Sequence, residues 1–126
     1  MRFLSEEWAE AVKEAVNADE EFGAAAAGKE ARIQQIVTGA PEGETRYWVS
    51  LSDGAVETGV GDIDAPDATI TQDYETAVKL AKGELSGASA YFGGQLQIQG
   101  DLMKLMGLQS VLGKVGEILR SIDAEY

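Results

Sequence analysis

The sequence predicts an α+β fold in which helices cover one face of a five-stranded, largely antiparallel sheet. Apolar and polar residues alternate with the period of half-buried strands in five segments, at 31–38, 45–51, 55–60, 68–71 and 95–99. Apolar residues recur with helical spacing before, between and after these segments. The dipeptide Asp53-Gly54 separates two of the strands and is a strong hairpin signal.

The N-terminal residues predict two helices that lie on the core. Ser5 precedes two glutamates, and a hydroxyl cap followed by acids in the first turn favours a helix start. This helix ends near Asn17 and carries an apolar stripe at Trp8, Val12 and Val16. A second, short helix is expected over 20–27, with Asp19 as its N-cap and Gly28 as its stop.

The first strand and the hairpin each contain one irregular position. Ile36 interrupts the alternation of the first strand and indicates a bulge or a strand covered on both faces. Trp48 has the opposite parity to its apolar neighbours in the strand 45–51, and we expect it to pack under the N-terminal helices. The acidic residues 61–67, which include a proline, then predict a loop.

The segment after this loop predicts a short strand followed by a helix. Thr71 is expected to cap that helix, whose first turn is acidic, and Gly83 to close it. The small residues of 86–92 then predict a turn or another helix that leads to the next strand.

The stretch 91–107 predicts a strand, a sharp turn and a helix, and the rest of the chain is interpreted from it. Leu96 and Ile98 alternate with three glutamines, so one face of this strand must be covered. Gly100 permits a sharp turn, and the carboxylate of Asp101 can cap a helix. The residues that follow spread apolar groups over more of a helical turn than one packing face requires, at Leu102, Met103, Leu105 and Met106. This surplus suggests an apolar cavity.

Residues 108–122 predict a terminal helix that is loosely held and can shift. Its apolar residues step by four and three, at Leu108, Leu112, Val115, Leu119 and Ile122. Gly107, Gly113 and Gly116 lie within or beside it, and each costs about 1 kcal/mol relative to alanine in a helix interior. We expect a break at Met106-Gly107 between a short helix and this longer one.

Composition limits the classes of function. The 126 residues suffice for one domain, 1–126, with its own core. Cysteine and histidine are both absent, which removes thiolate nucleophiles, the commonest general base and most metal sites. We therefore expect no enzyme, no metal and no cofactor. The sequence also has no apolar run long enough to span a membrane and no apolar h-region of a signal peptide, so we expect a cytoplasmic protein.

The charge of the chain is strongly acidic but unevenly placed. Its 22 Asp and Glu against 10 Lys and Arg give a net charge of −12, which disfavours nucleic acid as a partner. From Thr76 to Ile122, five basic residues stand against three acidic ones, a local net of +2. Only this later half lacks repulsion from an anionic lipid surface, so we expect at most transient membrane contact.

The order of motifs resembles the sterol carrier protein type-two family over roughly residues 45–106. The motifs are the Asp53-Gly54 turn, the run from Ala65 to Thr71, Lys82-Gly83-Glu84-Leu85, and above all the series Phe92, Gly94, Leu96, Ile98, Gly100 and Asp101. The resemblance implies a five-stranded sheet whose helices enclose an apolar tunnel for a fatty acid, fatty acyl-CoA or sterol-like lipid. The chain does not end in a peroxisomal signal, and its acidity looks like that of a stand-alone prokaryotic member.

The resemblance makes lipid binding and transfer without catalysis the expected function, with the C-terminal helix as the gate. The residues expected to contact the lipid are Phe92, Leu96, Ile98, Leu102, Met103, Met106, Leu108, Leu112 and Val115. Met103 and Met106 are preferred among them because unbranched side chains can reshape around different ligands. A long acyl chain is the expected ligand.

Several other interpretations stay open at this point. The apolar residues of the last helices could be ordinary core, and Phe92 could anchor that core instead of gating a cavity. Lys104 could pair a lipid head-group or be a surface lysine, while the carboxylates of 62–67 form a solvated loop instead of a calcium site. The main alternative function is an interaction module whose C-terminal helix closes on a partner or a second copy. Sequence alone leaves the oligomeric state open.

Overall fold

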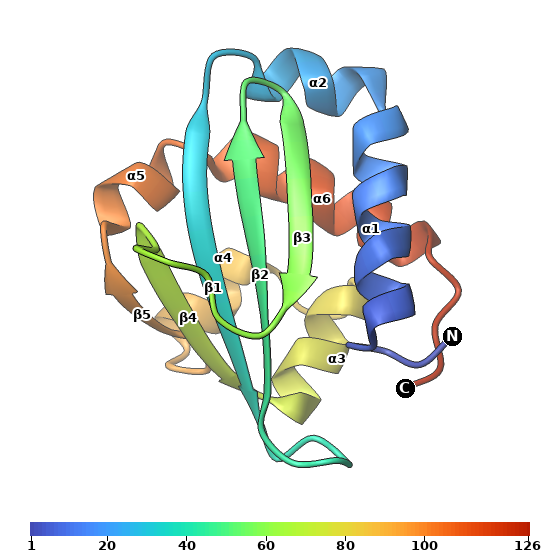
Figure 1. The fold of residues 1–126 in the computed structure, drawn as a ribbon. Coiled ribbons are helices and arrows are strands. Elements are labelled where there is room, and N and C mark those ends of the chain that lie inside the picture. Colours follow the sequence, from blue (N-terminus) through green and yellow to red (C-terminus); the bar gives the residue numbers. More distant parts are fainter.

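Five strands form one sheet whose central strand is the first in the chain. The computed structural model describes the backbone of residues 1–126 and all side chains except that of Ala88. The strands are β1 Glu30–Thr38, β2 Thr45–Ser52, β3 Ala55–Val60, β4 Ala68–Asp73 and β5 Gln97–Gly100. They are ordered β3-β2-β1-β4-β5; β1 and β4 are parallel, and the other three pairs are antiparallel (Figure 1). The predicted five-stranded, largely antiparallel sheet is confirmed.

The β2–β3 hairpin turns at the two residues that the sequence singled out. Asp53 and Gly54 have φ angles of 44° and 85°, and positive φ at both central residues is what a type I′ turn requires. Asp53 also accepts a hydrogen bond from the N–H of Gly28 at 2.8 Å, which joins the hairpin tip to the end of the second helix. The predicted hairpin is confirmed.

Six helices accompany the sheet, mostly on one side of it. They are α1 Glu6–Ala18, α2 Glu20–Ala26, α3 Tyr74–Lys82, α4 Gly87–Phe92, α5 Leu102–Met106 and α6 Gln109–Ser121. In Figure 1, α3, α4 and α6 lie behind the sheet and α1 stands beside β3. α6 packs against α1, α2 and α3. The expected N-caps Ser5, Asp19 and Asp101 each accept a hydrogen bond from the third residue after them.

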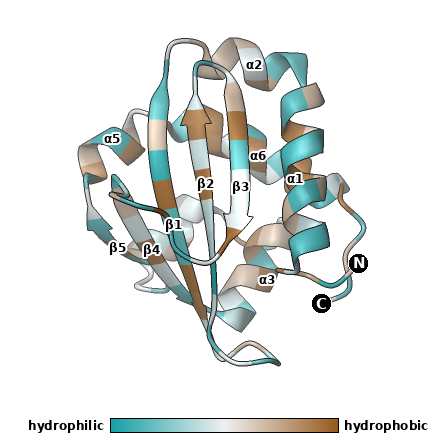
Figure 2. Cartoon of the chain, viewed as in Figure 1, coloured by the Kyte–Doolittle hydropathy of each residue, from teal (hydrophilic) through white to brown (hydrophobic). Residues whose placement is uncertain are grey.

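The hydrophobic core lies between the sheet and these helices. Val37 of β1 and the helical residues Val16 and Phe22 are its largest fully buried side chains. The register places Ile33 and Val37 on the face of the sheet that also presents Leu51, because side chains two apart along a strand share a face. Figure 2 shows brown, hydrophobic bands on the strands and on α1 and α6, which supply residues to this core.

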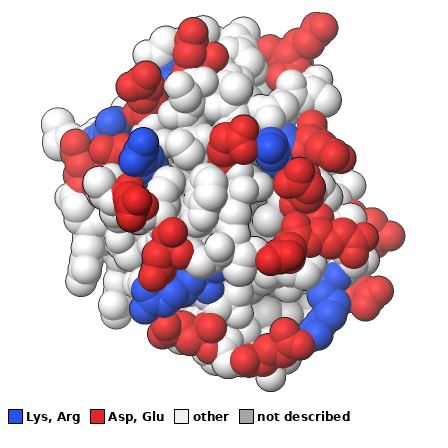
Figure 3. All heavy atoms as spheres, in the orientation of Figure 1, with Lys and Arg blue, Asp and Glu red and all other residues white. Residues whose placement is uncertain are grey.

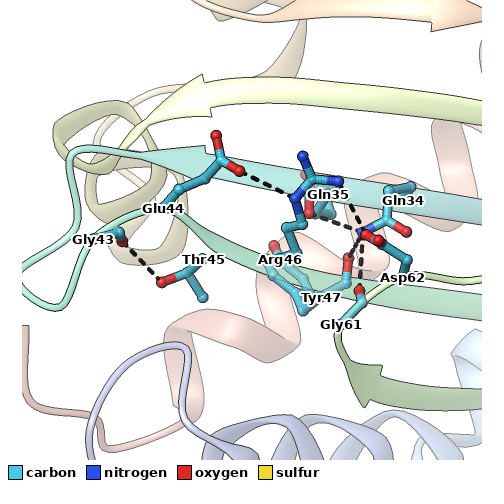
Figure 4. Close-up of polar contacts among 9 residues, drawn as sticks. All are labelled: Gln34, Gln35, Gly43, Glu44, Thr45, Arg46, Tyr47, Gly61 and Asp62. Atoms are coloured by element: carbon cyan, nitrogen blue, oxygen red, sulfur yellow. Dashed lines mark hydrogen bonds and ion pairs between the residues drawn. The ribbon is translucent and has the colours of Figure 1, made fainter.

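The outer face of β1 is covered by a loop, which explains why its alternation is imperfect. Gln34 is buried, and its amide nitrogen donates to the carbonyl oxygens of Tyr47 and Gly61, both at 3.1 Å (Figure 4). Its side-chain oxygen accepts from the N–H of Ile63 at 2.9 Å. The ladder with β2 runs without a bulge past Ile36. Of the two interpretations of this strand, cover on both faces is therefore the one observed.

Trp48 lies on the side of the sheet opposite to α1, so the expectation that it packs under the N-terminal helices is wrong. α1 lies on the face that presents Tyr47, whose ring meets that of Trp8 edge-on at 5.5 Å. The next residue along a strand must point the other way. Trp48 lies there across Gly59, where an added Cβ atom would stand 2.5 Å from the indole ring.

Two predicted element boundaries are also wrong. β4 continues through Thr71, and the side chain of Asp73 caps α3 by accepting from the N–H of Thr76 at 2.8 Å. β5 begins later than expected because the N–H groups of residues 95 and 96 both bond the carbonyl oxygen of Ala90, at 2.8 and 3.2 Å. These bonds wrap the chain around the end of α4 before it can join the sheet.

Candidate functional site

The turn between β5 and α5 fixes the centre of the candidate site. Gly100 has a φ of +112°, and a Cβ atom there would stand 2.5 Å from the carbonyl oxygen of Asp67. That same oxygen accepts from the N–H of Asp101 at 2.8 Å, and the Asp101 carboxylate accepts from the N–H of Lys104 at 3.0 Å. Only glycine satisfies both the close approach and the left-handed backbone. The turn therefore holds α5 against the start of β4.

Asp67 is the electrostatic anchor of this turn. Its carboxylate accepts from the backbone N–H of Arg32 at 2.7 Å and pairs with the Lys104 ammonium group at 3.3 Å. The hydrogen bond from Arg32 and, to a lesser degree, the charge and hydrogen bond of Lys104 lower the pKa of Asp67. Lys104, predicted as a head-group partner or a surface lysine, is thus engaged within the protein.

Five of the nine predicted lipid-binding residues are buried or half-buried. Leu108 is buried in the core, and Leu96, Ile98 and Val115 are half-buried against it. Leu102, on the first turn of α5, is also half-buried. These five side chains come from β5, the segment before it, α5 and α6, so the turn at Gly100 brings the end of the sheet and the last two helices together. They form the inward set.

The other four predicted residues point to solvent. Phe92 is 85% exposed and Met103 79%, while Met106 and Leu112 are 57% and 38% exposed. Phe92 is therefore not the core anchor that one interpretation expected. On α5, Leu105 is buried where the two methionines are not, because a helix of five residues can turn only one side toward the core. The structure does not bring all nine residues around one space.

The buried face of the last helix differs from the predicted seam by one residue. Val111 and Ile118 are buried, whereas Leu112 lies outside. The predicted break is confirmed, since α5 ends at Met106 and α6 begins at Gln109. The restart of the helix changes its phase relative to α5, and the sequence spacing alone did not fix that phase. No side chain caps the start of α6.

Two hollows on the surface lie away from both sets of residues. The larger, about 570 Å³, lies between the chain termini and the residues around the β1–β2 turn, and several of its lining side chains are charged, including Arg2, Glu42 and Arg46. The smaller, about 340 Å³, lies at the ends of β1 and β2 and reaches Lys104. Neither contains any of the nine predicted residues. A continuous apolar tunnel therefore stays an expectation.

The cluster of aromatic residues that joins the two termini was missed by the sequence analysis. The ring of Phe3 meets that of Trp8 edge-on and those of Tyr74 and Tyr126 at a tilt, with ring-centroid distances of 5.1, 6.0 and 4.9 Å. The N–H of Phe3 donates to the carbonyl oxygen of Glu125 at 2.9 Å. The residues after α6 are thereby fixed to the start of the chain. Their only signal in the sequence was the aromatic residue type near each end.

The acidic loop 61–67 uses its carboxylates separately. Asp62 pairs with Arg46 at 3.1 Å, as Figure 4 shows, whereas Asp67 bonds the turn described above. Within the part of the chain that the structure describes, no group of three or more acidic residues could hold a metal ion. The described helices also include none that is both long enough and apolar enough to cross a bilayer.

The sequence and the fold both resemble known proteins. Residues 9–113 match the SCP-2 sterol transfer family. The structure is similar to a Thermus thermophilus protein described as possibly a sterol carrier protein, with a TM-score of 0.83, 22% identity and coverage of 99% of this chain and 92% of that one. It is also similar to a crystal structure of sterol carrier protein 2, with a TM-score of 0.84, 22% identity and coverage of 97% and 100%.

The description of a third similar structure names a lipid. The solution structure of palmitated SCP2L2 from Aedes aegypti has a TM-score of 0.54 and 20% identity, with coverage of 93% of this chain and 96% of that one. At these identities the three likenesses establish the fold. No curated protein sequence matches the chain.

Proposed function

This chain belongs to the SCP-2 sterol transfer family, and from that premise we propose that it binds a lipid without catalysis and transfers it between donors and acceptors. We propose a single long acyl chain as the ligand. The palmitate of the Aedes aegypti protein supports this choice of ligand class. The proposal includes a cytoplasmic location and needs neither a cofactor nor a metal.

One observation carries the proposal: the inward set has more apolar surface than the core uses. Leu96, Ile98 and Val115 are only half-buried, although they touch the core. A lipid chain seated between the end of β5 and the helices α5 and α6 would complete their burial. Its binding requires these elements to separate by the width of an acyl chain, because the two hollows described above lie elsewhere.

The energy of such binding is sufficient without a covalent bond. Removing about 15 methylene groups from water at about 0.8 kcal/mol each gives roughly 12 kcal/mol in gross terms. Association and ordering cost about 4–15 kcal/mol, so the net affinity extends to the micromolar range. A reversible affinity of this order suits a carrier, which must also release its ligand.

We place the gate at the junction of α5 and α6. The start of α6 has no side-chain cap, and Gly113 and Gly116 each face open space where a Cβ atom would stand. The middle of α6 is tied to α2 by the ion pair of Lys114 with Glu21, and its end is fixed by the aromatic cluster. The first turns of α6 are therefore the part that can move with the least loss of contacts.

Ligand binding is tested on the delipidated protein. Native mass spectrometry after addition of palmitate should show one added lipid mass, and a fluorescent fatty-acid analogue should be displaced by palmitate. Leu102→Trp should weaken this binding about tenfold or more, because a larger apolar side chain occupies the proposed space without introducing charge. Val60→Trp, on an exposed apolar residue of the far edge strand, is the matched control.

The possible outcomes distinguish a lipid carrier from the interaction module. Loss of analogue binding in Leu102→Trp with retention in Val60→Trp, both with unchanged circular dichroism, supports the inward set as the site. Equal affinities of the two variants would remove Leu102 from it. A wild-type protein that stays lipid-free in both assays would overturn the proposal and favour the interaction module.

A further inference from the structure

A long segment of this highly charged chain is almost free of charge. One residue in four is charged overall, yet residues 85–113 contain only Asp101 and Lys104. Both of these are engaged internally, since Asp101 caps α5 and Lys104 pairs with Asp67 at 3.3 Å. No other charged side chain of this segment is available to meet solvent or a partner.

The same segment exposes most of the large apolar side chains on the surface. Of the seven that are exposed among the described side chains, five lie within it, at Tyr91, Phe92, Met103, Met106 and Leu112. We call these five the apolar edge. They come from the end of α4, the outer side of α5 and the first turn of α6, on either side of the edge strand β5 in the sequence. In Figure 3 the surface near β5 carries no charged residue, whereas acidic and basic residues are visible near α5.

We propose that the apolar edge rests on the surface of a lipid bilayer whose zwitterionic head-groups carry no net charge, while the lipid passes in or out. This inference deepens the proposed function and rests on it. α5 turns Leu105 into the core and Met103, on the opposite side of the helix, into solvent, while Leu102 is half-buried. The proposed lipid site and the bilayer therefore lie on opposite sides of one short helix, which makes the transfer route short.

The charge distribution of the chain favours a zwitterionic bilayer over an anionic one. Outside residues 76–122 the chain carries a net charge of −14, and those residues carry +2. An anionic bilayer would repel most of the molecule, and the apolar edge has no free lysine or arginine with which to offset that repulsion. α1, the other amphipathic helix of the same length as α6, has four glutamates and one lysine and is unsuited to a membrane surface.

The side chains themselves favour a bilayer over a protein partner. Phe92 and Met103 protrude almost fully into solvent instead of lining a groove that a complementary surface could fill. Tyr91 lies beside Phe92 with ring centroids 5.6 Å apart, and an aromatic pair with one polar tip is typical of residues at the head-group level. The two flexible methionines adapt to acyl chains that have no fixed shape.

The test measures sedimentation of the whole protein with vesicles. Wild type should bind phosphatidylcholine vesicles weakly and reversibly, with little dependence on salt. Partial replacement of phosphatidylcholine by phosphatidylglycerol should weaken binding, and most at low salt. The double variant Phe92→Ser/Met103→Ser should lose binding about tenfold or more, since burial of one such side chain alone is worth about tenfold.

The matched control is Val60→Ser, which removes an exposed apolar side chain from the opposite edge of the sheet and should bind vesicles as wild type does. Phe92 and Met103 were predicted lipid contacts, but the structure places both in solvent, outside the inward set. The affinity of the double variant for the fatty-acid analogue without vesicles should therefore stay unchanged, which separates this inference from the proposed function. Wild-type vesicle binding in the double variant, or stronger binding to phosphatidylglycerol, would overturn it. So would a wild type that ignores vesicles and dimerises through these residues in sedimentation equilibrium.

Discussion

The two ends of the helical layer are built differently, although both are rich in large apolar residues. Where the termini meet, the ring of Phe3 contacts those of Trp8 and Tyr126, and both Phe3 and Trp8 are buried. At the apolar edge, Phe92 and Met103 remain in solvent. The first region uses its apolar surface to hold the fold together, and the second keeps it free. Apolar content alone therefore does not distinguish core from site; the contacts of each side chain do.

The largest expected difference between the two regions concerns stability. Trp8→Ala should lower the free energy of unfolding by about 3–5 kcal/mol, because it removes a buried ring that meets Phe3 and Tyr47. Phe92→Ala should change it by about 0.5 kcal/mol or less. Urea unfolding followed by circular dichroism measures both. Similar losses in the two variants would mean that Phe92 is part of the core.

Glycine substitutions within the later half should have opposite signs. Gly100→Ala should destabilise the protein by about 2–4 kcal/mol, since its Cβ atom would clash with the Asp67 backbone at a φ of +112°. Gly113→Ala should stabilise it by about 1 kcal/mol, because the position is helical and open. Gly113→Ala should also slow release of the fatty-acid analogue in stopped-flow measurements. An unchanged release rate would argue against the α5–α6 gate.

Acid should loosen the turn before it affects the aromatic cluster. The pKa of Asp67 is lowered by folding, so its contribution is complete above the ordinary value of 3.8 and is lost as the pH falls through the lower folded value. Asp67→Asn should cost about 1–2 kcal/mol at neutral pH and flatten the loss of stability below pH 3.8. Denaturant melts at a series of pH values test this. If stability falls with pH in the variant as it does in wild type, groups other than Asp67 are responsible for the loss. Asp73 is one such group, because its pKa is also lowered by folding.

The smallest expected effect on stability is that of the tie between α6 and α2. Glu21→Gln should cost about 0.5 kcal/mol or less, because the Glu21–Lys114 pair is largely exposed. It should nevertheless speed ligand release, since it frees the middle of α6. Glu75→Gln, which breaks the Glu75–Lys79 pair within α3, should leave the release rate unchanged. Equal release rates in the two variants would show that this tie does not restrain the gate.

The elements of this protein can be predicted from its sequence wherever the signal is local. The Asp53-Gly54 turn, the cap at Asp101, the break after Met106 and the five strands all follow from residue types within a few positions of one another. Backbone conformational preference and alternation act over that range, so they can be recognised without knowing the partners. Residues 45–106 likewise carried the family resemblance, which the match over residues 9–113 confirms.

Which apolar side chains are covered depends on how the elements pack, and the sequence pattern does not reveal it. Val111 and Leu112 are adjacent in the sequence, yet the restart of α6 buries Val111 and exposes Leu112. Tyr47 and Trp48 are likewise adjacent, yet only Tyr47 contacts α1, because α1 packs on the face of the sheet that presents Tyr47. Hydrophobicity is a property of the residue, whereas burial depends on the helix or strand that arrives from elsewhere in the chain, and spacing alone does not fix where it docks.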